Sequence, residues 1–302
     1  MRAVRYDRFT GIDGLQVVER PDPQPAVGTV VVKVMASSVN PATLPALDGA
    51  PYVPGRDLAG EIVSVGEQPG SEGGDLAIGD AVLGRVQDWW AHAELVVVPS
   101  AQLVRKPAGL SWDVAGSLYT PAMAALAAVR AVAPGPDELV IVAGASGGVG
   151  LTAAQLARRR GAKVIGLAGS DRHAWLAEHD IVGVTYGRGE KDRLLEAAGA
   201  RQIDAFIDAG GTGSVALALD LGVAAERINT VVDFATARRR GVSTHGTDSA
   251  GGPAAFAELA DLAAHGLDFP IAAAYPLGEV RTAYRDIADH RPFGRIVLHP
   301  QE

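Results

Sequence analysis

Hydrophobic residues in the first third of the chain occur in short runs that proline and glycine separate. The runs at 29–35, 60–65 and 94–98 are alternating or continuously apolar, and turn-forming residues lie between them. Short strands joined by loops are typical of this pattern. We therefore predict a β-rich region, in which 71–75 is a surface loop and not a domain linker, because strand-like sequence resumes directly after it.

From about Ser111 the pattern changes to Ala-rich helical sequence, and then to apolar runs that alternate with helical stretches up to about residue 245. Alternation of strands and helices indicates βαβ units. Several of the runs are apolar throughout, as in a parallel sheet that is covered on both faces, so we predict a doubly wound fold. The predicted strands are 139–143, 163–167, 183–186, 203–207 and 227–232.

The C-terminal part returns to strand-like sequence. After a predicted helix at 254–265, short apolar runs at 271–274 and 295–298 flank a helical stretch at 278–288. A chain of 302 residues exceeds the roughly 100–200 residues of a typical domain, so we expect two domains. The predicted domains of this α/β protein are a β-rich domain at 1–115 and 266–302, and a doubly wound parallel-sheet (Rossmann) domain at 116–265.

Charge and composition narrow the function classes. The formal net charge of −8 is spread along the chain, which argues against a nucleic-acid partner and an anionic membrane surface. Because there is no cysteine, disulfides, thiolate zinc sites and iron–sulfur clusters are excluded, and redox chemistry requires a bound organic cofactor. No apolar signal core and no stretch of roughly 18 apolar residues occurs. We expect a cytoplasmic protein with no membrane partner.

The strongest local signal is an apolar strand, 139–143, followed by the glycine-rich GASGGVG at 144–150 and then helical sequence. We expect Gly147 and Gly148 to let the backbone turn tightly, and Gly150 to let the helix pack near the strand. The amides that open the helix then suit a pyrophosphate. A tight connection without a ligand is the alternative. The predicted dinucleotide contacts in this loop are Ser146, Gly147, Gly148, Val149 and Gly150.

The second predicted strand of this region indicates which nicotinamide cofactor binds. An NAD site places an acidic residue near the end of that strand, but Lys163–Ala168 ends without one. The following Ser170, Arg172 and His173 offer a hydroxyl, a cation and an imidazole to a 2′-phosphate, so we predict NADPH. Asp171 argues for the opposite preference, and Ser170 as a helix cap beside a solvated Arg172 is the alternative.

Several motifs, taken together, resemble the medium-chain dehydrogenase/reductase superfamily, and within it the quinone oxidoreductase branch. They are SVNP at 38–41, PYVPGRDLAGEIVSVG at 51–66, IGDAV at 78–82, AHAELVVVP at 91–99, the glycine loop, Tyr186 and FGRIVLHP at 293–300. The resemblance covers nearly the whole chain. It implies that the β-rich domain is a GroES-like catalytic domain, that the protein is a homodimer, and that NADPH reduces a quinone or an α,β-unsaturated carbonyl in a cleft between the domains.

The same resemblance predicts that the chain binds no metal. Zinc-dependent relatives carry a cysteine where Asn40 stands and a His-Glu pair where Arg56 and Asp57 stand. Asn40 is a poor zinc ligand and Arg56 repels a cation, so zinc-assisted alcohol oxidation is not expected.

The resemblance also implies roles for single residues. Asn40 is expected near the nicotinamide as an oxyanion donor, with Tyr52 or water as the proton source. Tyr186 is expected beside the cofactor phosphates, and Phe234 in the loop after the fifth strand. The predicted substrate-pocket residues are Trp89, Trp90 and His92, with ordinary packing as the alternative for each.

Two departures from the family pattern leave the substrate open. The stretch between Asn40 and Tyr52 is short and has Thr43 where an aspartate is usual, and the usual Leu-Thr-Ala motif is Met123-Ala124-Ala125. An enoyl reductase that acts on a biosynthetic intermediate, or a non-catalytic NADPH-binding sensor, remains an alternative to a quinone reductase.

Overall fold

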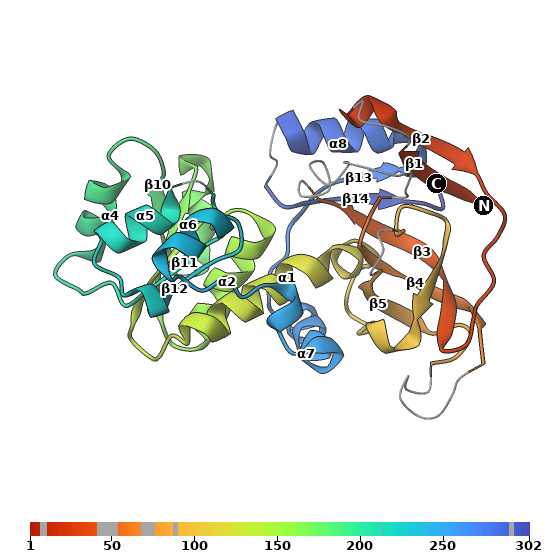
Figure 1. Cartoon of the computed structure of the whole chain (residues 1–302), viewed down its shortest axis with the longest axis horizontal. Coiled ribbons are helices and arrows are strands. Elements are labelled where there is room, and N and C mark those ends of the chain that lie inside the picture. Colours follow the sequence, from red (N-terminus) through yellow and green to blue (C-terminus); the bar gives the residue numbers. More distant parts are fainter. Residues whose placement is uncertain (7–10, 41–53, 68–75, 87–89, 212, 290–292) are drawn as a thin grey trace. The chain divides into compact units, whose positions relative to one another are not determined.

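The computed structural model describes residues 1–6, 11–40, 54–67, 76–86, 90–211, 213–289 and 293–302 (Figure 1). These form two compact units, Met1–Thr120 with Pro253–Glu302, and Pro121–Gly252. We call them the β-rich unit and the parallel-sheet unit. Among the described residues, no helix combines the length and hydrophobicity that crossing a membrane requires.

The β-rich unit is built on a sheet with the strand order β13-β14-β3-β4-β5-β7, in which β6 also pairs with β3. All pairs are antiparallel except β13 with β14. A hairpin of β1 and β2, which the sequence analysis did not predict, pairs separately. The strands are β1 Arg2–Tyr6, β2 Leu15–Glu19, β3 Thr29–Val39, β4 Asp57–Val65, β5 Ala81–Arg85, β6 Leu95–Pro99, β7 Leu103–Arg105, β13 Ile271–Pro276 and β14 Arg295–His299.

Helix α8 (Val280–Asp289) covers one part of this sheet and contacts β13 and β14 (Figure 1). Its buried face, which includes Val280, Ala283 and Tyr284, packs with Val39 and Leu298 of the sheet. Apolar residues at helical spacing therefore place α8 next to the end of β3. The helices α1 (Trp112–Val132) and α7 (Gly252–Ala264) include the points where the chain passes between the units.

The parallel-sheet unit has the strand order β10-β9-β8-β11-β12, and all four pairings are parallel. The predicted α/β architecture, with a β-rich part and a doubly wound parallel sheet, is confirmed. The elements of this unit, besides the part of α1 that belongs to it, are β8 Leu139–Ala143, α2 Gly148–Arg159, β9 Lys163–Ala168, α3 His173–Glu178, β10 Ile181–Thr185, α4 Glu190–Ala198, β11 Ala205–Asp208, α5 Ser214–Asp220, β12 Ile228–Thr230 and α6 Phe234–Arg240.

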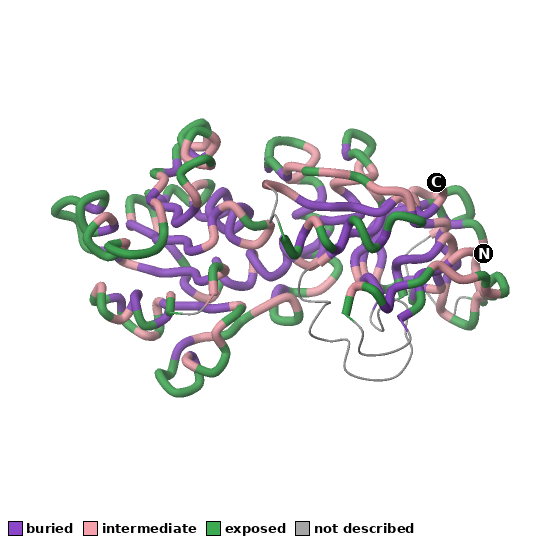
Figure 2. Tube along the Cα trace, turned by 90° about the horizontal axis from the view of Figure 1, so that it is seen from above, coloured by how far each residue is buried: buried purple, intermediate pink, exposed green. Residues whose placement is uncertain are grey.

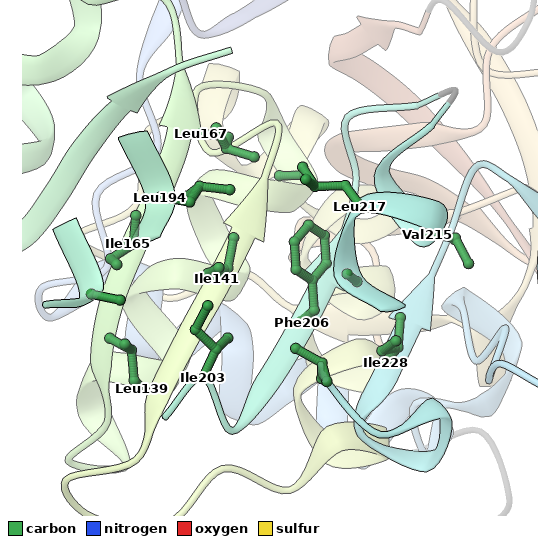
Figure 3. Close-up of a cluster of buried hydrophobic side chains, with 14 of the residues drawn as sticks. Leu139, Ile141, Ile165, Leu167, Leu194, Ile203, Phe206, Val215, Leu217 and Ile228 are labelled. Carbon is green, nitrogen blue, oxygen red and sulfur yellow. The ribbon is translucent and has the colours of Figure 1, made fainter. Parts of the chain in front are cut away.

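The core of this unit lies on both faces of the sheet. On one face, Ile141, Phe206 and Leu167 pack with Leu194 of α4 and Leu217 of α5 (Figure 3). Neighbouring residues of a strand point to opposite faces, so the other side of β8 and β9 is the one that α2 contacts. Strands β8, β9 and β11 are accordingly buried at nearly every position, and Figure 2 shows buried segments inside the molecule with exposed segments at its outside. A sheet buried on both faces leaves the loops at its strand ends as the surface for function.

Candidate functional site

The carboxyl ends of the parallel strands are where an open α/β sheet binds its ligands. From β8 the chain moves outward to β9 and β10, and then crosses back to β11 and β12 on the other side of β8. The strand order therefore reverses between β8 and β11. The glycine loop 144–147 follows β8 at this point, which is the expected position of a dinucleotide site in such a fold.

The glycine loop makes its tightest turn at Gly144. Its φ is +74°, whereas Gly147 has a φ of −87° and Gly148 is not among the glycines with positive φ. The one positive φ of this loop is therefore at Gly144, and the expected close approach of a ligand to Gly147 and Gly148 stays a prediction. Gly150 lies against the loop, because a Cβ there would be 2.2 Å from the carbonyl oxygen of Gly144. This close approach lets α2 begin next to the strand end.

The first turn of α2 offers its amides to a ligand. Gly147 precedes the helix without a side-chain cap, and it is exposed. The amide of Leu151 already donates to Gly147 at 2.8 Å, but the three amides before it have no acceptor within an α-helix. The helix has 12 residues, so its dipole adds to the attraction for an anion. The loop therefore fits the pyrophosphate of a dinucleotide.

The residues after β9 were predicted to hold a 2′-phosphate. Ser170 is exposed, and the Arg172 guanidinium pairs with the Asp171 carboxylate at 3.1 Å. His173 begins α3 and packs over Gly183, where a Cβ would be 2.6 Å from the imidazole ring. Its Nε2 is buried without a hydrogen-bond partner among the described residues. The three predicted residues thus follow the strand that should bind the adenosine ribose, and Asp171 lies among them.

Exposed apolar side chains occur at the ends of the outer strands. Tyr186, directly after β10, is 63% exposed. Phe234 is 55% exposed and is the first residue of α6, whereas it was predicted in the loop after the fifth strand. The structure thus leaves both aromatic rings accessible, and their contact with a cofactor stays a prediction. Phe234 lines a pocket together with Arg238, Val242 and Thr244.

Two buried polar residues that the sequence analysis missed shape the same edge. Asp208, at the end of β11, accepts hydrogen bonds from the amides of Gly210 and Gly211 at 3.0 and 3.1 Å, and from the Thr230 hydroxyl at 2.7 Å. The Thr230 oxygen in turn accepts from the amides of residues 232 and 233. These bonds fix the loops after β11 and β12. An aspartate that ends an apolar strand, with one residue between it and a glycine pair, is the sequence signal for this arrangement.

In the β-rich unit, the predicted catalytic residue Asn40 directly follows β3 and is half-buried. Ser37 and Ser38, just before it, are buried and hydrogen-bonded to other elements. The Ser37 hydroxyl donates to the backbone oxygen of Asp57 at 2.8 Å, and the Ser38 hydroxyl accepts from Arg295 at 3.2 Å. The backbone that leads to Asn40 is therefore anchored on both sides.

His92 was predicted to line the substrate pocket, with packing as the alternative. The structure favours packing, because the side chain is fully buried. Nδ1 lies 2.9 Å from the Ser37 hydroxyl and Nε2 lies 3.1 Å from the Tyr284 hydroxyl. Since Ser37 donates to Asp57, the imidazole donates through Nδ1 and accepts through Nε2, as a neutral ring does. Burial lowers the pKa of His92 to about 3, so the ring is uncharged at neutral pH.

Asp57 is a second buried polar centre in this unit. Its carboxylate accepts from the Thr120 amide at 3.0 Å and from the Thr120 hydroxyl, and the Arg295 guanidinium lies nearby. Burial raises the pKa of Asp57, against the hydrogen bonds from Thr120 and the charge of Arg295. The carboxylate that stands where zinc relatives have a ligand thus has its oxygens directed at Thr120.

The remaining predicted site residues divide into two groups. Trp90 is 38% exposed, and Arg20 lies over its ring at 5.0 Å from the centroid. Tyr52 and Trp89 lie outside the described residues. Within the described ranges, no three His, Asp or Glu side chains are grouped in a way that would hold a metal ion.

Known proteins resemble this chain in sequence and in fold. Residues 26–108 match the alcohol dehydrogenase GroES-like domain. The chain is 30% identical over 222 residues to the human quinone oxidoreductase, which covers 69% of this chain and 66% of that protein. It is 34% identical over 167 residues to a zinc-type alcohol dehydrogenase-like protein of Schizosaccharomyces pombe, covering 51% of this chain and 49% of that protein. These matches span about half to two thirds of the curated relatives' own lengths.

Similarity in structure extends over the whole chain. The quinone oxidoreductase of Coxiella burnetii superimposes with a TM-score of 0.86 and is 25% identical, and the match covers 99% of both chains. Both units of this chain therefore have counterparts in one known protein.

Proposed function

Because this chain belongs to the medium-chain dehydrogenase/reductase superfamily, in its quinone oxidoreductase branch, we propose that it reduces a quinone or an α,β-unsaturated carbonyl with NADPH and without zinc. The observation that carries the proposal is the glycine loop at the reversal of strand order, with Gly150 packed against Gly144 and the first amides of α2 free of helical acceptors. The names of the human and Coxiella burnetii relatives support the reaction class.

In the proposed two-electron reduction, different residues bind the cofactor, stabilise negative charge and supply a proton. NADPH, when bound, supplies the hydride. The loop amides and the residues after β9 and β10 hold the cofactor, and Asn40 donates a hydrogen bond to the acceptor oxygen that gains negative charge. A proton from Tyr52 or water then completes the reduced product. We also propose that the protein forms a homodimer, and that its catalytic domain spans 1–115 with 266–302 and its dinucleotide-binding domain 116–265.

The experiment that tests the function measures NADPH oxidation with a panel of quinones and enones. Turnover of quinones or simple enones supports the proposal. Turnover only with acyl enones of a biosynthetic kind favours the enoyl reductase, and NADPH binding without turnover of any acceptor favours the sensor. Full activity in a chelator, with no zinc by elemental analysis, is expected; a stoichiometric zinc lost together with activity contradicts the zinc-free mechanism.

The cofactor preference gives the first prediction. Arg172→Ala should weaken NADPH binding about tenfold to a hundredfold, because one charge-assisted contact to the 2′-phosphate is worth about 1.5–3 kcal/mol. NADH binding should change little. The matched variant Asp171→Asn frees the guanidinium from its ion pair and should strengthen NADPH binding. Fluorescence titration with both cofactors measures this, and equal affinity of the unaltered protein for NADPH and NADH would contradict it.

The proposed oxyanion donor gives the second prediction. Asn40→Ala should lower turnover about a hundredfold while NADPH affinity stays nearly unchanged, because a lost oxyanion donor acts in the transition state. Asn40→Asp keeps the shape but replaces the amide donor with a carboxylate, and it should be at least as slow. Steady-state kinetics with a quinone, together with a cofactor titration, separates the two effects. Wild-type turnover by Asn40→Ala would show that the donor lies elsewhere.

A further inference from the structure

The turn after β10 is held by a single arginine of the next helix. The Arg193 guanidinium, on α4, donates to the carbonyl oxygen of Thr185 through Nε at 3.1 Å and through Nη2 at 2.7 Å. Nη1 donates to the carbonyl oxygen of Arg188 at 2.9 Å, and Nη2 also donates to the carbonyl oxygen of Gly187 at 3.3 Å. One side chain therefore binds the carbonyl groups on both sides of Tyr186.

The same turn is fixed from a second direction. The Glu190 carboxylate accepts from the Gly187 amide at 2.7 Å, and the Glu190 amide donates to the Gly187 carbonyl at 2.8 Å. Gly187 and Gly189 have φ values of +97° and +78°, where other residues are strained. Few conformations remain open to a backbone that is bonded in this way on both sides of one residue.

The braced turn presents an exposed ring. Tyr186 is 63% exposed, although its neighbours are held by α4: Thr185 accepts two hydrogen bonds from Arg193, and Gly187 is bonded to both Arg193 and Glu190. Surface tyrosines in general need no such bracing. A ring that contacts a ligand gains from it, because a preorganised contact loses less entropy when the ligand binds.

We propose that Arg193 is a positioning residue for the dinucleotide, and that it acts by holding the turn so that Tyr186 faces the cofactor. The inference rests on the proposed function, because Tyr186 is assigned there to the cofactor. Arg193 spends its donors on backbone carbonyls of the turn, so its effect on binding passes through the turn and not through a direct contact with a phosphate.

The chemistry of arginine separates this role from a simple charge effect. The planar guanidinium offers five donors in a fixed fork and reaches three carbonyl groups at once. A lysine at this position keeps the positive charge but has a compact ammonium group that does not reproduce the fork. If Arg193 acted only through its charge on the anionic cofactor, lysine would replace it without loss.

The test is a double-mutant cycle on NADPH affinity, measured by fluorescence titration with the intact protein. Arg193→Met should weaken NADPH binding about tenfold, and Arg193→Lys nearly as much. In a Tyr186→Ala background, Arg193→Met should change the affinity by less than about twofold. Arg159→Met, which removes an exposed arginine at the end of α2, is the matched control and should leave the affinity unchanged. Thermal unfolding of each variant is recorded alongside.

Other results overturn the inference. Independent effects of Tyr186→Ala and Arg193→Met, or full binding by Arg193→Lys, would show that Arg193 does not act through Tyr186. If Arg193→Met fails to fold, Arg193→Lys completes the same cycle. If the unaltered protein binds neither NADPH nor NADH, both the proposed function and this inference are wrong. If it binds NADPH normally but the effects of Arg193→Met and Tyr186→Ala are not coupled, only the positioning role is wrong.

Discussion

Asp57→Ala is expected to lower the free energy of unfolding by about 2–6 kcal/mol, because it leaves two donors of Thr120 without their acceptor at about 1–3 kcal/mol each. The Thr120 amide and hydroxyl both donate to the carboxylate of Asp57, which is only 1% exposed. Alanine also leaves a cavity beside the Arg295 guanidinium, which is itself buried.

Asp57→Asn is the matched control, and it should cost at most about 1 kcal/mol. The asparagine carbonyl accepts from the Thr120 amide, and the Thr120 hydroxyl rotates to accept from the new amide group. Burial raises the pKa of Asp57 despite the hydrogen bonds from Thr120 and the charge of Arg295, so the site does not favour the ionised carboxylate. We therefore expect the hydrogen bonds of Asp57, and not its charge, to provide most of its contribution to stability.

Urea unfolding of both variants at one pH measures the difference. Both variants keep the Arg295 charge, so the gap between alanine and asparagine isolates the hydrogen bonds and the cavity. Equal destabilisation by the two substitutions would mean that the charge of Asp57 is what matters. Because Ser37 donates to the backbone of Asp57, a shift of this residue also reaches the end of β3 and Asn40.

Local sequence patterns predicted the parallel-sheet unit closely. Strand β8 spans the predicted 139–143, since an apolar run there is bounded by Glu138 and by a glycine with positive φ. Strand β12 was predicted at 227–232 but ends at Thr230. The strand ends there because the Thr230 hydroxyl oxygen accepts hydrogen bonds from the amides of Val232 and Asp233, which turns the chain. Hydrophobicity does not reveal such a turn.

Hydrogen bonds between polar side chains that lie far apart in the chain were not predicted from the sequence. His92 was assigned to the substrate pocket because the matching family segment leads toward the active site, yet its partner Tyr284 is 192 residues away in the chain. Likewise Asp57 meets Thr120 across 63 residues. Which polar side chains meet inside a core depends on the pairing of strands and helices, and local patterns in a sequence do not reveal that pairing. The zinc-free assignment and the cofactor contacts rest on matched motifs, and they stay predictions.

Gly150→Ala should remove cofactor binding and weaken the fold together. Its Cβ would lie 2.2 Å from the oxygen and 2.6 Å from the carbon of the Gly144 carbonyl, both of which are backbone atoms. The loop and the first turn of α2 must therefore move apart. Such overpacking costs about 1–3 kcal/mol of stability. If the displaced loop loses two charge-assisted amide contacts to the pyrophosphate, NADPH affinity falls by more than about a hundredfold.

Gly147→Ala separates these two consequences. Gly147 has a φ of −87°, and the nearest atom to an added Cβ is the Gly144 oxygen at an ordinary 3.5 Å, so the fold should accept the methyl group. The residue is exposed in the loop, where the methyl group would stand in the way of a ligand that approaches the backbone. We expect unchanged thermal unfolding for Gly147→Ala, with NADPH binding weakened as it is in Gly150→Ala. Unaltered NADPH affinity in Gly147→Ala would show that the cofactor does not approach this loop, and wild-type stability of Gly150→Ala would refute the close packing on which the site depends.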